Sequence, residues 1–345
     1  MLRHDGESLY SRVLMKESEA TSELRWHPLL RQWVCVAAQR QGRPQLPEDW
    51  CPFCPGSGRV PGHYDVYLYP NDFPAFSPEN PPFLEDAEGF NATNGARGAC
   101  DVVLYSPDHR LLPSELTVEQ WGKVIDLWSR RSVELFQTDG IRYVAVFENS
   151  GVAIGVTMPH PHGQIYAVPF VPALVQTELD SATEHYRERG ECLYCRILKA
   201  EIEDRRRLVA SNGSFVAFLP FFGRFPTEMQ LYSRRHFQNL SDLTEAERWD
   251  LAALLKVVRQ KYDGLYAAAN PKSAPLPLMM LVRQAPVEGE HPYFHFHIDF
   301  LPIQRSATKL KYLAAMESGC GTFLNDTRAE EQAERLRNVE PKVAV

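Results

Sequence analysis

Residues 147–169 have the sequence FENSGVAIGVTMPHPHGQIYAVP, and the HPHGQ run within it carries the strongest functional signal in the chain. The end of this stretch alternates in residue character, which predicts a β-strand. His160, His162 and Gln164 are spaced by two, so they project from one face of an extended segment. An imidazole whose Nδ1 is held can attack through its other nitrogen, and a neighbouring amide can stabilise charge on the attacked group. An isolated pair of histidines on a polar strand more often has no such role.

The residues before this strand favour the chemical interpretation. Asn149, Gly151 and Gly155 belong to a polar, glycine-punctuated loop whose backbone donors can approach a phosphate. A Phe-Glu-Asn loop followed by Pro-His-Pro-His-Gly-Gln resembles the signature of the galactose-1-phosphate uridylyltransferases, a family of the histidine-triad superfamily. The resemblance runs from about Trp33 to Arg337.

Composition narrows the class of protein. A length of 345 residues is typical of two domains, and 44% hydrophobic with 23% charged residues is typical of soluble globular protein. The net charge of −7 argues against a general nucleic-acid or membrane partner, so a phosphate must be met by a local group of cations. The N-terminal residues lack an apolar core of signal-peptide length, and no run of about 18 apolar residues occurs. We therefore expect a cytoplasmic enzyme.

The seven cysteines are an odd number in a chain without an export signal, which favours reduced thiols. Four of them form two C-x-x-C pairs, Cys51 with Cys54 and Cys192 with Cys195. This spacing is typical of zinc sites or of redox dithiols, and no thioredoxin-like context surrounds it.

Histidines at matching positions favour zinc and reveal an internal repeat. Each pair is followed by a histidine, by a helix that opens with a capping-box threonine, and by a strand containing His-x-His. The repeated order predicts two zinc sites. Their expected ligands are Cys51, Cys54, His109 and His160 in the first copy and Cys192, Cys195, His236 and His295 in the second.

The second site has an alternative. Some relatives in the resembled family bind a metal with a glutamate and two strand histidines, which correspond to Glu178, His295 and His297, and they have a further histidine where this chain has Arg283. His291 is another candidate in place of His295. We favour the Cys2His2 set because it repeats the first site and because thiolates suit zinc.

Strand and helix patterns predict an α+β fold of two histidine-triad-like repeats, with an antiparallel half-barrel sheet and flanking helices. Strands are expected near residues 33–38, 99–106, 142–148, 163–171, 214–221, 228–234, 278–284 and 294–303. Residues 1–180 form the half with the first zinc site, and residues 181–345 the half with the second metal site. A polar stretch up to about residue 190 marks the boundary. Residues 1–25 are expected to be a loose arm and 85–98 a flexible loop.

Two further segments have residues suited to a nucleotide sugar. Arg40 and Arg43 flank a turn; such arginines are usually solvated, but two planar guanidiniums also suit a diphosphate, and the family has Arg-x-x-Arg-Pro here. Tyr69, Asn71 and Phe73 lie in a proline-rich loop. The family has an aromatic-x-Asn-Asp-Phe motif in its nucleotide pocket, which favours a base or ribose contact.

The resemblance implies a double displacement in Leloir galactose metabolism. His162 would attack the α-phosphorus of UDP-glucose, glucose 1-phosphate would leave, and galactose 1-phosphate would take the uridylyl group, with Gln164 donating to a phosphoryl oxygen. The family's sites are shared across a homodimer, to which Arg40, Arg43 and Glu317 would contribute. Further substrate contacts implied by the resemblance are Asn149, Gly155, Thr157, Lys311, Tyr312 and Glu317.

Two other functions remain open at this point. Met316 stands where the family usually has tyrosine, and the chain has a glycine-rich segment at 319–322. Plant relatives with a similar segment act on ADP-glucose as phosphorylases, so an adenylyl-transferring phosphorylase is the first alternative. The second is a non-catalytic zinc-dependent protein that binds nucleotides.

Overall fold

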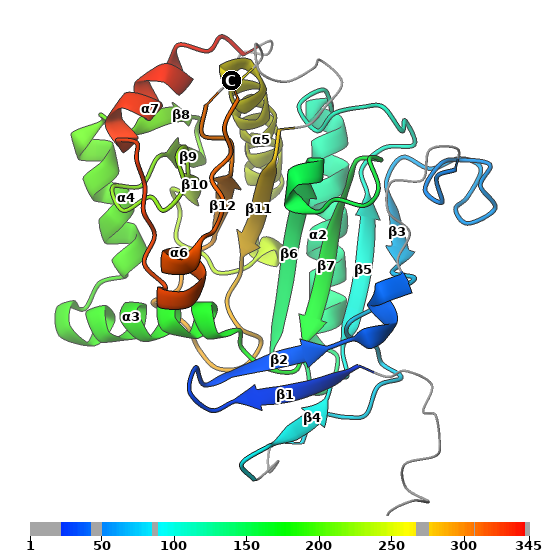
Figure 1. The fold of residues 1–345 in the computed structure, drawn as a ribbon. Helices are drawn as coiled ribbons and strands as arrows, with labels where there is room; N and C mark the ends of the chain where they lie inside the picture. The colour runs from blue at the N-terminus through cyan, green and yellow to red at the C-terminus, as the bar shows by residue number, and fades with distance from the viewer. Residues whose placement is uncertain (1–21, 43–49, 85–88, 267–275, 307, 342–345) are drawn as a thin grey trace, which may run out of the picture.

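The computed structural model describes residues 22–42, 50–84, 89–266, 276–306 and 308–341 (Figure 1). Its helices and strands are β1 (Glu23–His27), β2 (Gln32–Val36), η1 (Ala38–Gly42), β3 (Tyr67–Pro70), β4 (Thr93–Gly95), β5 (Ala99–Leu104), α2 (Val118–Phe136), β6 (Tyr143–Ser150), η2 (Val152–Ile154), β7 (His162–Val168), α3 (Ala173–Arg189), α4 (Leu193–Asp204), β8 (Leu208–Ser211), β9 (Phe215–Phe218), β10 (Met229–Ser233), η3 (Leu240–Asp242), α5 (Glu245–Leu265), β11 (Leu278–Arg283), β12 (His297–Pro302), α6 (Ala315–Cys320) and α7 (Ala329–Arg337). None of the helices in these ranges has the length and apolar character to cross a membrane.

One large sheet joins the two repeats. Within the described ranges it has nine strands in the order β3-β5-β7-β6-β11-β12-β10-β9-β8, and every neighbouring pair is antiparallel. Outward from the central β6 and β11, β7 corresponds to β12, β5 to β10 and β3 to β9, and β8 is an additional edge strand of the second half. A long helix follows β5 and another follows β10. This mirrored order confirms the predicted α+β fold of two repeats.

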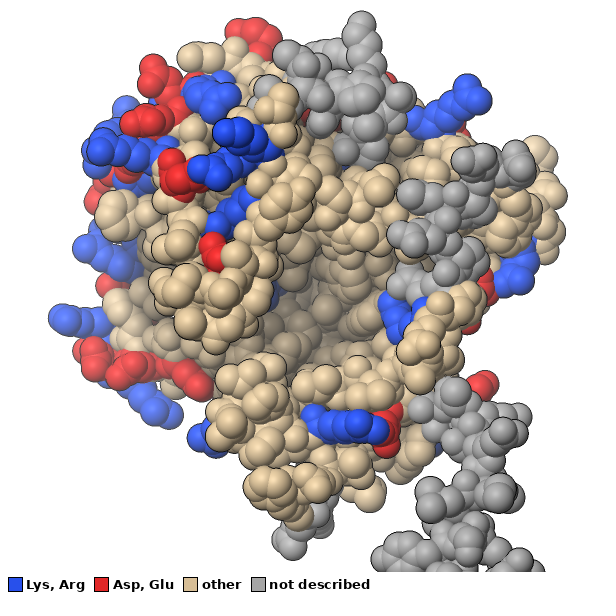
Figure 2. Space-filling view, in the orientation of Figure 1, with Lys and Arg blue, Asp and Glu red and all other residues tan. Residues whose placement is uncertain are grey.

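The two long helices cover one face of the sheet, behind it in Figure 1. Each begins at the predicted threonine: Thr117 accepts a hydrogen bond from the backbone N–H of Gln120 at 3.0 Å, and Thr244 accepts one from Glu247 at 3.3 Å. Their apolar stripes bury side chains such as Trp121, which is fully buried and contributes about 2 to 3 kcal/mol. The opposite face is hollowed over the central strands, and the charged side chains visible on this face lie mostly toward its edges (Figure 2).

A smaller three-stranded sheet, β2-β1-β4, corrects two expectations. Residues 23–25, expected to belong to a loose arm, are part of β1, which pairs with β2 and buries Leu24 completely; residues 1–21 of the expected arm lie outside the described ranges. The expected flexible loop at 85–98 contains β4, which pairs with β1. The strand predicted at 33–38 stops at Val36 and is followed by the turn η1.

The polar stretch near residue 180 is helical. It belongs to α3, which buries Val175, Leu179 and Ala182 and exposes charged residues on its other faces. The predicted boundary between the halves therefore falls inside a helix, and the polar composition reflects its exposed face. Strand β12 also begins three residues later than expected, because the N–H of Phe296 donates to the carbonyl of Phe237 at 2.7 Å instead of joining the sheet.

Candidate active site and metal centres

His162 is the first residue of β7, where it pairs with Leu104 of β5. Its Nδ1 lies 2.7 Å from the backbone oxygen of His160. A carbonyl oxygen only accepts, so Nδ1 carries the hydrogen and the lone pair of the neutral ring lies on Nε2. This is the arrangement that a nucleophilic imidazole requires.

Gly163 allows the strand to pass close to a buried tyrosine. A Cβ atom at this position would lie 2.2 Å from the hydroxyl of Tyr105 and 3.1 Å from the carbonyl of Phe147. Any larger residue would push β7 away from β5 and β6. Glycine therefore lets His162 and Gln164, on either side of it, keep their place on the opposite face of the strand.

A cavity of about 280 Å³ lies beside His162 and Gln164. Four more of its lining residues were predicted from the sequence, namely Tyr69, Asn71, Phe73 and Thr157. The side chain of Asn71 accepts a hydrogen bond from the N–H of Phe73 at 2.9 Å, which gives this loop its turn. The cavity has the aromatic and polar lining that a nucleoside requires.

Sequence reasoning missed a charged pair in the wall of this cavity. Arg59 donates to the hydroxyl of Tyr69 at 2.8 Å and forms an ion pair with Asp72, and the Tyr69 hydroxyl donates to Asp72 at 2.9 Å. Trp50 lines the same cavity. Asp72 is next in sequence to the predicted Asn71, so its position could have been used to predict it. Nothing in the sequence distinguishes Arg59 from the other surface arginines.

The loop between β6 and β7 lies on the other side of His162. Asn149 and His162 both line a smaller cavity of about 70 Å³. Gly155 has a φ of 83° and donates its N–H to the carbonyl of Val152 at 2.9 Å, so its observed role is to close the turn η2. Thr157 lies beyond the turn and faces the larger cavity.

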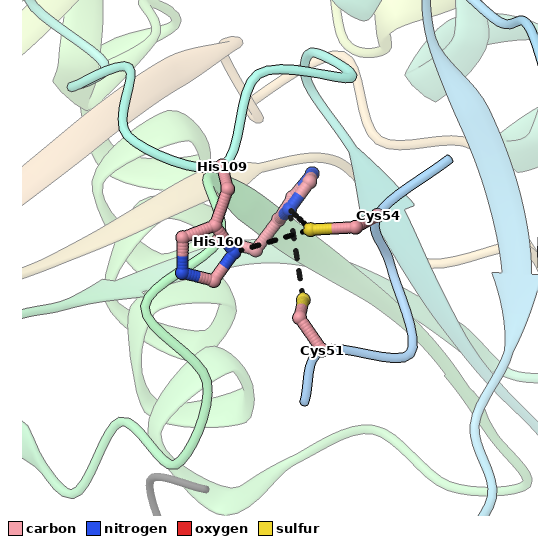
Figure 3. Close-up of side chains that lie close together, drawn as sticks. All are labelled: Cys51, Cys54, His109 and His160. Carbon is pink, nitrogen blue, oxygen red and sulfur yellow. Dashed lines mark hydrogen bonds between the residues drawn. The ribbon is translucent and has the colours of Figure 1, made fainter. Parts of the chain in front are cut away.

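The four predicted ligands of the first metal site converge (Figure 3). Their ligand atoms all lie within 4.8 Å of one another, and the Sγ of Cys54 is 3.4 Å from Nδ1 of His109 and 3.7 Å from Nδ1 of His160. The Nε2 of His160 donates to the carbonyl of Ser106 at 2.7 Å, which leaves the Nδ1 lone pair directed at the sulfurs. Burial lowers the pKa of His160 to about 4, so the ring is neutral, as a metal ligand must be. Two thiols and two imidazoles fit a four-coordinate site.

The second set of predicted ligands is assembled in the same way. The ligand atoms of Cys192, Cys195, His236 and His295 lie within 4.8 Å of one another. The Sγ of Cys195 is 3.2 Å from Nδ1 of both histidines, and Nε2 of His295 donates to the carbonyl of Ser233 at 2.8 Å. Each half therefore contains a group that could hold a metal ion.

The alternative ligands for the second site have other partners. Glu178 lies 3.5 Å from Arg283, which also pairs with Asp299 at 2.7 Å. His297 is buried, and burial lowers its pKa to about 4; its Nε2 is 3.9 Å from Asp299. The Nε2 of His291 donates to the carbonyl of Glu288 at 2.7 Å. These contacts favour the Cys2His2 set.

Comparison with known proteins identifies the family. The family model for the N-terminal domain of galactose-1-phosphate uridyl transferase matches residues 12–172, and the model for its C-terminal domain matches residues 178–344. The chain belongs to the galactose-1-phosphate uridyl transferase family. The galactose-1-phosphate uridylyltransferase of Thermotoga maritima is 36% identical over 93% of this chain and 99% of its own length.

Solved structures agree with this membership. A uridylyltransferase structure has a TM-score of 0.82 at 33% identity and covers 92% of this chain and 98% of its own. An ADP-glucose phosphorylase from Arabidopsis thaliana, solved with bound ADP-glucose, has a TM-score of 0.72 at 26% identity and covers 93% of this chain and 99% of its own.

Some residues predicted by resemblance to the uridyl transferase family lie away from His162. Lys311 and Glu317 form a buried ion pair at 2.9 Å, and neither lines the cavities beside His162. Tyr312 is 74% exposed. Arg40 donates to the carbonyl of Phe73 at 2.9 Å, so it braces the loop that contains Asn71 and Phe73. Arg43 lies outside the described residues.

Proposed function

We propose that this chain moves UMP between UDP-glucose and galactose 1-phosphate through a uridylyl-histidine intermediate at His162. The observation that carries the proposal is the 2.7 Å contact between Nδ1 of His162 and the carbonyl of His160, in a residue that lines both cavities. The names of the relatives support the substrates, and family membership supports the reaction class.

The reaction has two displacements. Nε2 of His162 attacks the α-phosphorus of UDP-glucose, a P–N bond forms, and the bond to the bridging oxygen breaks to release glucose 1-phosphate. A phosphate oxygen of galactose 1-phosphate then attacks the same phosphorus, and the electron pair of the P–N bond returns to the imidazole. Gln164 donates to a non-bridging oxygen, with Asn149 and Thr157 near the same phosphate.

Zinc is the metal that best fits both Cys2His2 groups, and its role at each would be structural coordination. At the first group, the ring of His160 would be fixed as a ligand while its backbone carbonyl fixes His162. The first site therefore holds the nucleophile in place without touching the substrate. Reduced thiols at both groups fit a reducing compartment such as the cytoplasm.

The remaining substrate contacts are assigned to a homodimer. None of Lys311, Tyr312 and Glu317 is among the residues that line the cavities beside His162 of their own chain, and Tyr312 is exposed. In the dimer they would contact the sugar phosphate at the partner's His162, together with Arg40 and Arg43. The two halves, residues 1–180 and 181–345, would thus have different roles. The first provides the nucleophile, and the second provides sugar contacts.

Intact-protein mass spectrometry tests the substrate. After incubation with UDP-glucose, the protein should gain the mass of one uridylyl group, and added galactose 1-phosphate should remove it. ADP-glucose should add nothing. An adduct from ADP-glucose alone would identify an adenylyl-transferring phosphorylase, as the Arabidopsis relative suggests. Binding of both nucleotide sugars without any adduct would identify a non-catalytic nucleotide-binding protein.

A further inference from the structure

Helix α5 of the second half presents a row of polar residues to the first half. Lys256, Arg259, Gln260 and Asp263 share one helical face by their spacing. Nζ of Lys256 donates to the carbonyl of Leu116 at 2.8 Å, and Gln260 donates to the carbonyl of Ser114 at 3.3 Å. Lys256 and Arg259 are both buried, which is uncommon for such residues and requires partners.

Arg259 reaches the end of β6. Its Nη2 lies 2.9 Å from Oε1 of Glu148 and 3.0 Å from the hydroxyl of Ser150, and that hydroxyl also donates to Glu148. Arg259 is 4% exposed and Glu148 is 1% exposed. The three side chains form one buried cluster, here called the Arg259 cluster.

Two members of the Arg259 cluster border the small cavity beside His162. Glu148, Asn149 and Ser150 all line the small cavity with His162. Side chains alternate along a strand, so Asn149 points to the face opposite that of Glu148 and Ser150. Ser150 is also the last residue of β6 before the turn that leads to Thr157. Holding Glu148 and Ser150 therefore fixes the direction of Asn149 and the start of the loop that leads to Thr157.

We infer that Arg259 is a positioning residue for the uridylyl transfer proposed above. From the second half of the chain, its guanidinium holds Glu148 and Ser150 and thereby orients Asn149 and the loop beside His162. One nitrogen, Nη2, contacts a carboxylate and a hydroxyl together, so the position of the planar guanidinium sets direction as well as charge. The inference rests on the proposed function and names a contribution of the second half to the chemistry of the first.

The competing explanation is that Arg259 only neutralises a buried carboxylate. Removing one partner of a buried ion pair strongly destabilises a protein, whereas removing both can be nearly neutral. The double variant Arg259→Met, Glu148→Gln therefore separates stability from positioning. Arg259→Lys is a second variant that keeps the charge but replaces the rigid, planar guanidinium by a compact ammonium group on a flexible stem.

The matched control is Arg248→Met. Arg248 is also on α5 and also joins the halves, through an ion pair with Asp126 of α2 at 3.0 Å, but it does not contact β6. Its side chain is 29% exposed, and an ion pair at this position contributes little to stability. This control should keep the wild-type kcat/KM.

The experiment measures kcat and KM for UDP-glucose, zinc content and the midpoint of thermal unfolding. Arg259→Met should lower the midpoint by about 10 °C. The double variant should regain most of this midpoint yet lose about 100-fold in kcat/KM, the cost of misplacing a substrate contact. Arg259→Lys should keep the midpoint and lose at least about tenfold. Zinc content should not change in any variant.

Wild-type kcat/KM in either the double variant or Arg259→Lys would overturn the inference, because charge alone would then explain Arg259. A failure of the proposed function is recognised separately, since the wild-type protein itself would then form no adduct with UDP-glucose.

Discussion

Replacing His162 by glycine should lower kcat by on the order of 10⁵-fold, the effect expected when a covalent nucleophile is removed. The ring is only partly buried, and its contacts include the Nδ1 hydrogen bond to the carbonyl of His160 and the ring of Phe53, whose centroid is 5.6 Å away. Its loss therefore opens the cavity without removing a core side chain. Exchange of galactose 1-phosphate for glucose 1-phosphate measures the effect.

The fold and the metal should survive this change. His162 is not one of the four residues of the first metal group, so zinc content and the midpoint of thermal unfolding should match the wild type. His63→Gly, which removes an exposed histidine from a nearby loop, is the matched control and should exchange at the wild-type rate. Near-normal exchange by His162→Gly would contradict the mechanism.

The double variant Cys51→Ser, Cys54→Ser should lose about one equivalent of zinc by the four-ligand rule. It should also lose at least about 100-fold in kcat. Without the metal the ring of His160 is no longer fixed, and the backbone oxygen of His160 is the group that holds His162. Elemental analysis and the exchange assay measure the two effects on the same preparation.

The second metal group provides the comparison for this variant. Cys192→Ser, Cys195→Ser should also lose about one equivalent of zinc, since this group has the same ligand set. Its loss in kcat should be smaller, because His295 holds His297, which lies outside both cavities at the nucleophile. Unchanged zinc content in the Cys51, Cys54 variant would refute the assignment of the first zinc site. Equal losses of kcat in the two double variants would refute the idea that the first metal group acts by holding the adjacent His162.

Local patterns with fixed spacing predicted the repeat, and they predicted which Cys and His residues lie together in each half. His-x-His, C-x-x-C and the threonine caps each depend on residues close in sequence, and the two copies of the same order support one another. The mirrored strand order follows from that repeat, because each copy must bury one face of its strands under one helix.

Contacts between distant segments could not be predicted. Two such contacts are the ion pairs of Arg59 with Asp72 and of Arg259 with Glu148. Neither pair has a sequence spacing that a helix or strand pattern would bring together, and in the sequence each arginine resembles an ordinary solvated one. Helix α3 was missed as a helix because only a narrow stripe of it is apolar. The resemblance to the family proposed Lys311 and Glu317 as sugar contacts, but the structure of one chain pairs them with each other.

The structure gives a physical reason for expecting one nucleophile rather than two. His297 has the same Nδ1 contact as His162, at 2.8 Å to the carbonyl of His295, yet it is 2% exposed. The rings of Tyr194 and Tyr232 lie 5.1 and 4.9 Å from its ring. Asp299 stands where the first copy has Gln164, and a carboxylate there would repel a phosphoryl group.

Trapping the intermediate distinguishes these two histidines. The protein would react briefly with UDP-glucose labelled at its α-phosphate, be quenched in base to preserve the acid-labile P–N bond, and be digested for peptide mapping. The label should map to the peptide that contains His162 and to no other. Stoichiometric label on the peptide that contains His297 would show that both halves are catalytic and would contradict the assignment of His162 as the single nucleophile.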